Sequence, residues 1–369
     1  MKKASLPAAP QKLRFNGPIV LPEFANIQDP SGPIRGVDTG GGYRAGDVMF
    51  ANDSRFLETY YSEPLTNFSV GWRDPNNIEA TLEFFAPAVP VGRRFEWKAA
   101  TNAEEFLSEV VDDQRAIGAD FKAVKYTGTD VTDKTLNRGL SIVVDLDNVA
   151  GTGLGSGVAA PWQTNAVAKL TRRLYRNSYR RALAALSAAA TSVPLVWAPA
   201  AQTAGVIPVN PDMDVQSDLV TQTTITGIRN NRVAYGDSAF LYRQQAYGAQ
   251  NNPAGYLGYN ANPEGSMAAA LMVDKVLISR ERYQSAASTK SEILGATVYS
   301  FFANSGVDTE DPSNIKRFVS MFDAEQGGGL FRVYVQQISS KLVMISVEFY
   351  EKIVITYSSG IRKLTITNS

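Results

Sequence analysis

The 369-residue sequence contains no cysteine and no histidine. The absence of cysteine excludes disulfides, thiolate nucleophiles and cysteine-ligated zinc. The absence of histidine removes the commonest general base and the commonest metal ligand, so serine-histidine-aspartate and cysteine-histidine catalysis are excluded. Any enzyme built on this sequence would have to use carboxylate, lysine or tyrosine chemistry. The composition therefore favours a structural protein over an enzyme.

A surplus of charge of either sign is also absent, since Lys plus Arg and Asp plus Glu both number 36. A dedicated nucleic-acid reader usually has a basic domain, whereas neutrality limits repulsion between copies packed in a dense array. No apolar run approaches the roughly 18 residues of a membrane span. Met1-Lys2-Lys3 is not followed by a hydrophobic run of signal-peptide length. We therefore expect a cytosolic protein, in a cell or a virus-infected cell, with no membrane contact.

Residues 1–75 are punctuated by proline, glycine and asparagine, as at Gly40-Gly41-Gly42, and carry only short apolar runs. Aromatic residues nevertheless recur in this segment, although disordered tracts are normally poor in them. They are Phe15, Phe24, Tyr43, Phe50, Phe56, Tyr60, Tyr61, Phe68 and Trp72. We predict an extended arm that buries these side chains on a partner, with Phe15, Phe24, Tyr43 and Phe50 as candidate contacts between subunits.

The next part, residues 76–150, is predicted to begin β-rich, between Ile78 and Phe95, and to contain a short helix at Ala103–Arg115. Lys122–Tyr126 and Leu140–Val144 have the β-branched content of strands, and the polar segment 127–137 between them is rich in turn residues. We predict that these two strands form a long hairpin. Because an isolated hairpin is marginal in water, it would lie on a neighbouring subunit, with Lys122 and Lys125 as candidate contacts.

A glycine-rich loop at residues 151–157 is followed by the strongest local pattern of the sequence, a helix from Trp162 to Ala190. Apolar residues recur along it at three- and four-residue steps. Further helices are predicted from Asp212 to Arg229 after the cap signal Asn210-Pro211, from Asp237 to Ala246, and from Gly265 to Met272. The remaining predicted elements are strands, at 232–235, 275–279, 296–303, 329–336, 342–349, 353–357 and 361–366.

None of the motifs that carry cofactors is complete. The glycines of residues 151–157 are followed by no Lys-Ser or Lys-Thr, so a phosphate-binding loop fails. Asp145-Leu146-Asp147-Asn148 lacks the glycine and glutamate positions of a calcium loop. The acidic pairs of the chain are more plausibly solvated turns than paired catalytic carboxylates. We expect no cofactor, no metal and no catalytic residue.

The long helix carries a basic stripe, since Arg172, Arg176 and Arg180 follow one another at four-residue steps, with Lys169 and Arg173 beside them. A solvated helix face is one interpretation. The other is contact with an acidic partner, which could be nucleic acid, a scaffold or a neighbouring copy, and with nucleic acid the binding would be salt-sensitive and independent of sequence. The helix has no acidic residues of its own to match the stripe, and this favours an external partner.

The order of these elements resembles that of the major capsid proteins of tailed bacteriophages. Matching stretches are residues 86–91 running into Phe95-Glu96-Trp97, Asn210-Pro211-Asp212 opening a helix, and residues 227–235 before Asp237. The resemblance implies an α+β, Hong-Kong-ninety-seven-type capsid fold. Its expected parts are an arm (1–75), the start of the peripheral domain with the hairpin (76–150), a hinge and spine helix (151–205), an axial domain (206–330) and C-terminal strands (331–369).

The resemblance also implies a function: a shell subunit that assembles with itself into the hexamers and pentamers of an icosahedral head around double-stranded DNA. The implied partners are other copies, scaffolding, portal and decoration proteins, and DNA bound without sequence specificity. The implied location is the virion, after assembly in the host cytoplasm. Two alternatives stay open, a tail or other virion structural protein and a histidine-free carboxylate hydrolase such as a glycosidase.

Overall fold

The computed structural model describes residues 60–75, 77–100, 128–149, 161–199, 209–249, 263–305, 312–322 and 329–368. The chain divides into two units, Met1–Thr59 and Tyr60–Ser369, and every described residue belongs to the second. The predicted contacts Phe15, Phe24, Tyr43, Phe50, Lys122 and Lys125 therefore lie outside the described residues. The same holds for the predicted helix at 103–115, the strand at 122–126 and the glycine loop at 151–157.

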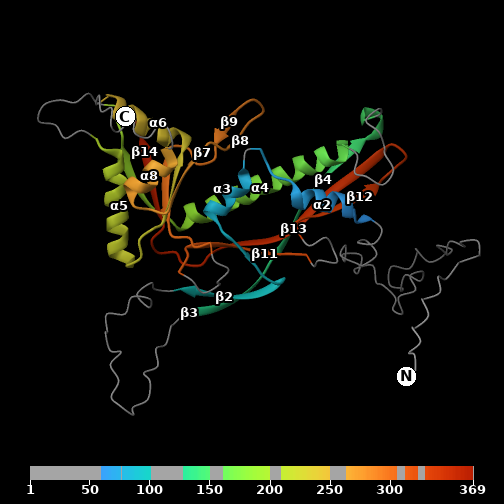
Figure 1. The fold of residues 1–369 in the computed structure, drawn as a ribbon, viewed down its shortest axis with the longest axis horizontal. Helices are drawn as coiled ribbons and strands as arrows, with labels where there is room; N and C mark the ends of the chain where they lie inside the picture. The colour runs from blue at the N-terminus through green and yellow to red at the C-terminus, as the bar shows by residue number, and fades with distance from the viewer. Residues whose placement is uncertain are drawn as a thin grey trace, which may run out of the picture. The chain divides into compact units, whose positions relative to one another are not determined.

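The first of two five-stranded sheets is organised around one long strand, β13 (Leu342–Ile355). Its other strands are β1 (Ala88–Pro90), β4 (Leu136–Asp145), β11 (Ile315–Ser320) and β12 (Arg332–Gln337). Strands β4, β11 and β12 all pair antiparallel with β13. The long helix α4 (Pro161–Ala189) runs along this sheet (Figure 1), and two short helices, α2 (Glu63–Gly71) and α3 (Ile78–Phe85), pack against α4.

The second sheet has the strand order β5-β14-β10-β6-β7. Its strands are β5 (Thr191–Val196), β6 (Arg232–Gly236), β7 (Lys275–Ser279), β10 (Thr297–Phe301) and β14 (Arg362–Thr367). One face packs into the apolar core beneath α4, through residues such as Ala234 and Phe301. The opposite face, through residues such as Val233, Tyr235 and Val298, packs against three helices. These helices are α5 (Pro211–Thr226), α6 (Asp237–Ala249) and α8 (Pro263–Leu271).

Two smaller ribbons complete the described part. Strand β2 (Arg94–Ala100) pairs with β3 (Gly128–Lys134), and β8 (Arg282–Gln284) pairs with β9 (Lys290–Glu292), both antiparallel. A short 3-10 helix, η3 (Leu146–Val149), follows β4. The segment predicted as separate C-terminal strands is divided between the sheets, since β12 and β13 belong to the first and β14 to the second.

The α+β class and the strongest local predictions are confirmed. The long helix spans Pro161–Ala189, and its apolar stripe, including Leu170, Leu174 and Leu186, is buried. Helix α5 begins at its predicted cap, where the Asn210 side chain accepts a hydrogen bond from the Met213 backbone N–H at 3.2 Å. Gly227 ends this helix with φ 73°, a left-handed conformation that glycine adopts without strain.

The predicted β-rich start at Ile78 is wrong, because residues 78–85 form helix α3. Ile78, Leu82 and Phe85 follow one another at four- and three-residue steps and are 0% exposed. The Phe85 ring lies 5.2 Å from that of Tyr179 on α4 and 5.8 Å from that of Phe301 on β10. This burial overrides the strand preference of the aromatic residues. The predicted arm is also too long at its end, since Leu65 anchors helix α2 in the same core.

The pairing predicted for the hairpin is wrong as well. Residues 140–144 belong to β4, which pairs with β13, whereas the segment predicted to be turn-rich contains β3, the partner of β2. The two strands predicted at 342–349 and 353–357 are one continuous strand, β13. Glu351 continues the strand because its side chain, 1% exposed, accepts a hydrogen bond from the Ser178 hydroxyl of α4 at 2.8 Å.

Candidate interaction surfaces

The arginines of the basic stripe on α4 make contacts within the chain. The Arg172 Nε atom lies 2.7 Å from Asp74 Oδ1, and the Arg176 Nε atom lies 3.3 Å from Glu281 Oε2. The Arg180 guanidinium stacks over the ring of Tyr283, 4.3 Å from its centre, a cation–π contact. The prediction that the acidic partners of this stripe lie outside the chain is therefore wrong for Arg172 and Arg176.

These contacts connect α4 to the second sheet. Glu281 lies in the connection between β7 and β8, and Tyr283 lies in β8. The Tyr179 hydroxyl of α4 shares a 2.8 Å hydrogen bond with the hydroxyl of Ser279, the last residue of β7. Burial raises the pKa of the Tyr179 phenol, so it stays protonated. A helix that packs on the first sheet is thus tied to edge strand β7 of the second sheet and to the β8–β9 ribbon that follows it.

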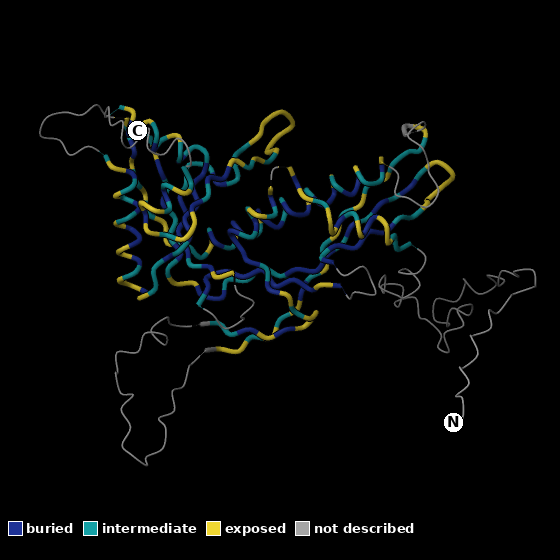
Figure 2. Tube along the Cα trace, in the orientation of Figure 1, coloured by how far each residue is buried: buried dark blue, intermediate teal, exposed yellow. Residues whose placement is uncertain are grey.

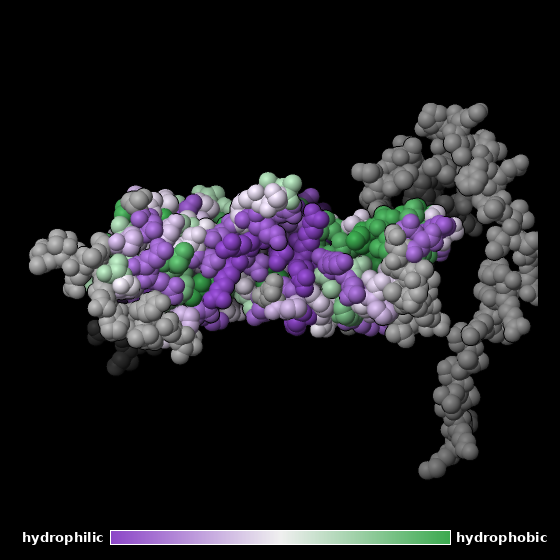
Figure 3. Space-filling view, turned by 90° about the horizontal axis from the view of Figure 1, so that it is seen from above, coloured by the Kyte–Doolittle hydropathy of each residue, from purple (hydrophilic) through white to green (hydrophobic). Residues whose placement is uncertain are grey.

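Part of the predicted basic stripe does face solvent. Lys169, Arg173 and Arg180 are exposed, and their spacing places them on one side of α4. Within the described ranges, neither Lys169 nor Arg173 has an ion-pair partner. Hydrophilic side chains form a broad band across the middle of the face seen from above (Figure 3). The cationic face of α4, meaning Lys169, Arg173 and Arg180, is a candidate contact for an anionic partner.

Sequence reasoning missed Arg181, which lies deepest in the structure among the cations of α4. Its guanidinium and the Ser178 hydroxyl both bind Glu351 Oε1 of β13. The Glu351 side chain is 1% exposed, so the pair compensates a buried charge and fixes α4 on the sheet. A glutamate within the apolar part of β13 was the signal of this contact in the sequence.

Most charged residues of the helix layer α5–α6–α8 pair inside the protein. Asp212 and Arg243 form a bidentate pair with both N–O distances at 2.8 Å, and the Arg243 side chain is 2% exposed. Asp218 of α5 accepts from Arg362 of β14 at 3.0 and 2.6 Å. Burial lowers the pKa of Arg243, but the hydrogen bonds and charge of Asp212 raise it by more. These pairs bind the layer to itself and to the sheet.

The other charged residues of this layer are also partnered. Asp214 accepts a 3.0 Å hydrogen bond from the Trp197 indole, and Asp237 pairs with Arg282 at 2.9 Å. Glu264 accepts a 2.9 Å hydrogen bond from the backbone N–H of Ile278. The pKa of Asp214 is raised by burial, although the indole hydrogen bond lowers it.

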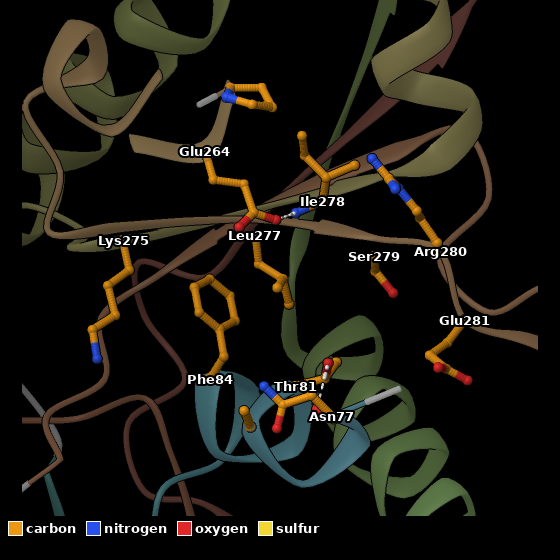
Figure 4. A pocket seen from close by; sticks show the side chains of 12 residues that line it. Asn77, Thr81, Phe84, Glu264, Lys275, Leu277, Ile278, Ser279, Arg280 and Glu281 are labelled. Carbon is orange, nitrogen blue, oxygen red and sulfur yellow. Dashed lines mark hydrogen bonds between the residues drawn. The ribbon is translucent and has the colours of Figure 1, made fainter. Parts of the chain in front are cut away.

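A groove of about 850 Å³ lies between α3, α8 and the edge strand β7 (Figure 4). Its two carboxylates, Glu264 and Glu281, are occupied by the Ile278 backbone N–H and by Arg176 respectively. In a carboxylate hydrolase at least one of the two groups takes up and releases a proton during the reaction, whereas both of these are held by partners within the chain. The groove therefore does not support the carboxylate hydrolase that the sequence left open. Within the described ranges, no cluster of acidic side chains could hold a metal ion.

The β2–β3 ribbon is a further candidate surface. Its base is anchored by Phe95 and Trp97, with the Phe95 ring 4.4 Å from that of Phe318 in β11. The opposite side of the ribbon, including Arg94, Glu96 and Thr132, is exposed (Figure 2). Among the described strands, β2 and β3 pair only with each other. One face of the ribbon is thus covered by β11 and β13, where Asp133 also pairs with Lys352 at 3.3 Å, and the exposed face is a candidate contact for another surface.

Among the described helices, none is long and apolar enough to cross a membrane.

No protein-family model matches the chain, and no curated protein matches its sequence. Solved structures do match. A phage-related protein from Bordetella bronchiseptica is 16% identical, with a TM-score of 0.56 over 82% of this chain and 96% of that chain. The capsid of the cyanophage P-SCSP1u is 9% identical, with a TM-score of 0.43 over 77% and 87%. The virus-like particle from Pyrococcus furiosus is 9% identical, with a TM-score of 0.42 over 82% and 96%. The chain thus shares its fold with the phage-related protein.

Proposed function

We propose that this chain is the major shell protein of a tailed bacteriophage, a structural subunit that assembles with copies of itself. The observation that carries the proposal is the exposed outer face of the β2–β3 ribbon, on a body with the fold of a phage-related protein. The inner face of the ribbon packs on β11 and β13, whereas its outer face is open to another surface, and identical copies supply one at every position of a shell. The occupied carboxylates of the groove support a structural role over a catalytic one.

The physical logic is the summation of many weak contacts. Each large apolar side chain buried on a neighbour contributes about 1.5–3 kcal/mol before the costs of ordering. A contact between two different surfaces of identical copies continues from copy to copy instead of closing as a dimer. The net charge of zero limits repulsion in such an array.

Within this proposal, the first sheet with α4 corresponds to the peripheral domain and the second sheet with α5, α6 and α8 to the axial domain. The sequence before Tyr60 corresponds to the arm, with Phe15, Phe24, Tyr43 and Phe50 as its proposed contacts, and Lys122 and Lys125 are the proposed contacts of the hairpin. Hexamers and pentamers would enclose double-stranded DNA, and the cationic face of α4 would meet it without reading sequence. Scaffolding, portal and decoration proteins complete the proposed partners, in a virion assembled in the host cytoplasm.

Negative-stain microscopy of the purified protein tests the proposal. We expect closed shells, rings or capsomers of uniform size, and deletion of the ribbon residues 94–134 should abolish them. Tubes would instead favour a tail protein. A protein that stays monomeric at high concentration, whatever the salt, would contradict the proposal.

A further inference from the structure

Strand β7 forms one edge of the second sheet, and among the described strands it pairs only with β6. The backbone N–H of Lys275 points to the β6 side, where the carbonyl oxygen of Asn231 accepts its hydrogen bond at 3.2 Å. Because backbone groups alternate in direction along a strand, those of Val276 and Ile278 point away from β6, toward the groove. A row of outward backbone groups is a template on which a further strand pairs.

A side chain occupies the middle of this edge. The Glu264 carboxylate accepts a hydrogen bond from the Ile278 backbone N–H at 2.9 Å (Figure 4). It therefore stands where the carbonyl oxygen of a paired strand would accept the same hydrogen bond. Glu264 is the second residue of α8, so its side chain can turn away while the rest of the helix stays in place. The carboxylate thus protects the edge in the free protein and is replaceable by a peptide carbonyl.

The groove beside this edge has an uncharged middle. One wall is a side of α3 on which Asn77, Ala80 and Phe84 follow one another at three- and four-residue steps. Phe84 and Leu277 lie between the two ends of the groove (Figure 4). The five residues of β7 extend over about 17 Å, the length of an equally short added strand. These dimensions suit a short extended peptide.

Charge selects the kind of peptide that fits. Lys275, the first residue of β7, and Arg280, which follows its last residue, are exposed and lie at opposite ends of the groove (Figure 4). Within the described ranges, neither side chain has an ion-pair or hydrogen-bond partner. Glu281 beside them is neutralised by Arg176 at 3.3 Å. Unpaired positive charges therefore stand at both ends of the open edge, where carboxylates would complement them.

We propose that this groove binds an extended acidic segment of another protein. The segment adds to β7 as a further strand of the second sheet and brings one carboxylate near Lys275 and a second near Arg280. In this mode of recognition the backbone hydrogen bonds supply affinity and the side-chain contacts supply specificity. The proposal goes beyond the shell function and does not depend on it, because each separate subunit carries the whole groove.

Other anions fit this groove less well. A nucleic acid has no backbone N–H groups that could pair with a strand. A small anion would reach only one of the two cations, since Lys275 and Arg280 are five residues, or about 17 Å, apart along an extended chain.

Fluorescence anisotropy with dissociated full-length subunits tests the proposal. The probe is the fluorescein-labelled peptide Gly-Glu-Thr-Val-Thr-Val-Glu-Gly, whose two glutamates have the five-residue spacing of Lys275 and Arg280. We expect it to bind, and Lys275→Glu with Arg280→Glu to weaken the binding about tenfold or more. The matched control is Lys134→Glu with Lys290→Glu, which makes the same charge change at exposed positions outside the groove and should leave the affinity unchanged. Thermal unfolding reports whether each variant is folded.

Two further measurements address the strand pairing. Two prolines in place of the central Val-Thr pair of the peptide remove one N–H group from each of its edges, and should weaken binding about tenfold or more. Glu264→Ala frees the Ile278 N–H and should strengthen binding of the first peptide about three- to tenfold, the contribution of one hydrogen bond.

Equal affinities of the groove variant and its control, equal affinities of the two peptides, or no gain from Glu264→Ala would overturn the proposal. Subunits with Lys275→Glu and Arg280→Glu also serve as competitors. If an excess of them displaced the peptide from unsubstituted subunits, the groove would belong to a segment of a second copy, and the assignment to another protein would be wrong. If the chain bound the peptide but formed no shells, the proposed function would fail and this inference would stand.

Discussion

Helix α4 and the α5–α6–α8 layer both cover a sheet, but they distribute charge in opposite ways. On α4, cations remain at the surface at Lys169, Arg173 and Arg180. On the α5–α6–α8 layer most charges are directed inward, as in the Asp212–Arg243 pair, whereas the Asp237–Arg282 pair lies at the surface. A buried charge must be compensated within the fold, whereas an exposed charge is solvated by water and available to a partner. The difference separates charges that are available to a partner from charges that stabilise the fold.

The largest effect should come from removing an inward charge of the α5–α6–α8 layer. Asp212→Ala leaves Arg243, 2% exposed, without its carboxylate. Breaking a buried pair in this way costs about 3–5 kcal/mol of unfolding free energy. Denaturant unfolding of dissociated subunits measures it, and Met213→Ala next to it should stay within about 0.5 kcal/mol. If Asp212→Ala lowered the unfolding free energy by less than about 0.5 kcal/mol, as a surface substitution does, Arg243 would not depend on Asp212 for its charge compensation.

A smaller effect is expected where a cation of α4 is only partly buried. Arg172→Ala leaves the buried Asp74 carboxylate without its ion pair, but water can reach the space because the Arg172 side chain is 36% exposed. We expect a loss of about 1–3 kcal/mol, the cost of leaving a buried acceptor unsatisfied. Lys169→Ala on the same helix serves as the control and should change stability by about 0.5 kcal/mol or less. Equal losses for Arg172→Ala and Asp212→Ala would remove the contrast between the two regions.

The third prediction concerns binding and leaves stability nearly unchanged. Replacing Lys169 and Arg173 by glutamine removes two exposed cations from α4. If this face meets DNA, the slope of log affinity against log salt should fall by about 0.9 for each lost phosphate contact. Titrations of duplex DNA at several salt concentrations measure the slope. Thr221→Gln and Thr224→Gln on α5 serve as the control and should leave this slope unchanged. An equal fall of the slope in both variants would show that DNA binding is not located on α4.

The smallest effect is a pH dependence within the α5–α6–α8 layer. Burial raises the pKa of Asp214 above its ordinary value of 3.8, so the folded state binds this proton more tightly than the unfolded state. The contribution of Asp214 to stability therefore falls as the pH rises from below 3.8 through the raised pKa, and stays low at neutral pH. Asp214→Asn, which can still accept from the Trp197 indole, should gain stability relative to the unsubstituted chain at pH 7 but not at pH 3. Urea unfolding at both values measures the difference, and a gain that is independent of pH would contradict it.

Much of the fold could be predicted where local pattern and tertiary environment agree. The spacing of Leu170, Leu174 and Leu186 predicts α4, and Asn210 predicts the start of α5, because apolar periodicity and caps act within a few residues. Prediction failed where contacts with residues remote in the sequence decide whether a segment forms a helix or a strand. Residues 78–85 read as strand but form α3 in an aromatic core shared with Tyr179 and Phe301, and 128–134 read as turn but pair with β2.

The candidate surfaces follow the same division. Lys169, Arg173 and Arg180 could be predicted as an exposed basic face from their positions alone, whereas the partners of Arg172 and Arg176 could not. Asp74 and Glu281 lie far from these arginines in the sequence, and only the packing of α4 against its neighbours brings them within ion-pair distance. The uncharged exposed residues of the α5–α6–α8 layer could not be predicted for the same reason. These helices contain charged residues, and only their packing on the sheet shows that most of these pair inside the protein.

By itself, the sequence determined the α+β class, the long helix and its cationic residues, and the exclusion of cysteine and histidine chemistry. These depend on composition and on spacing within a helix, which a chain carries in any environment. Only the tertiary structure decided which charges are neutralised inside and which remain outside. That choice depends on the distance between side chains from remote segments and on their burial, because a charge in water costs little while an unpaired charge in the interior cannot be tolerated.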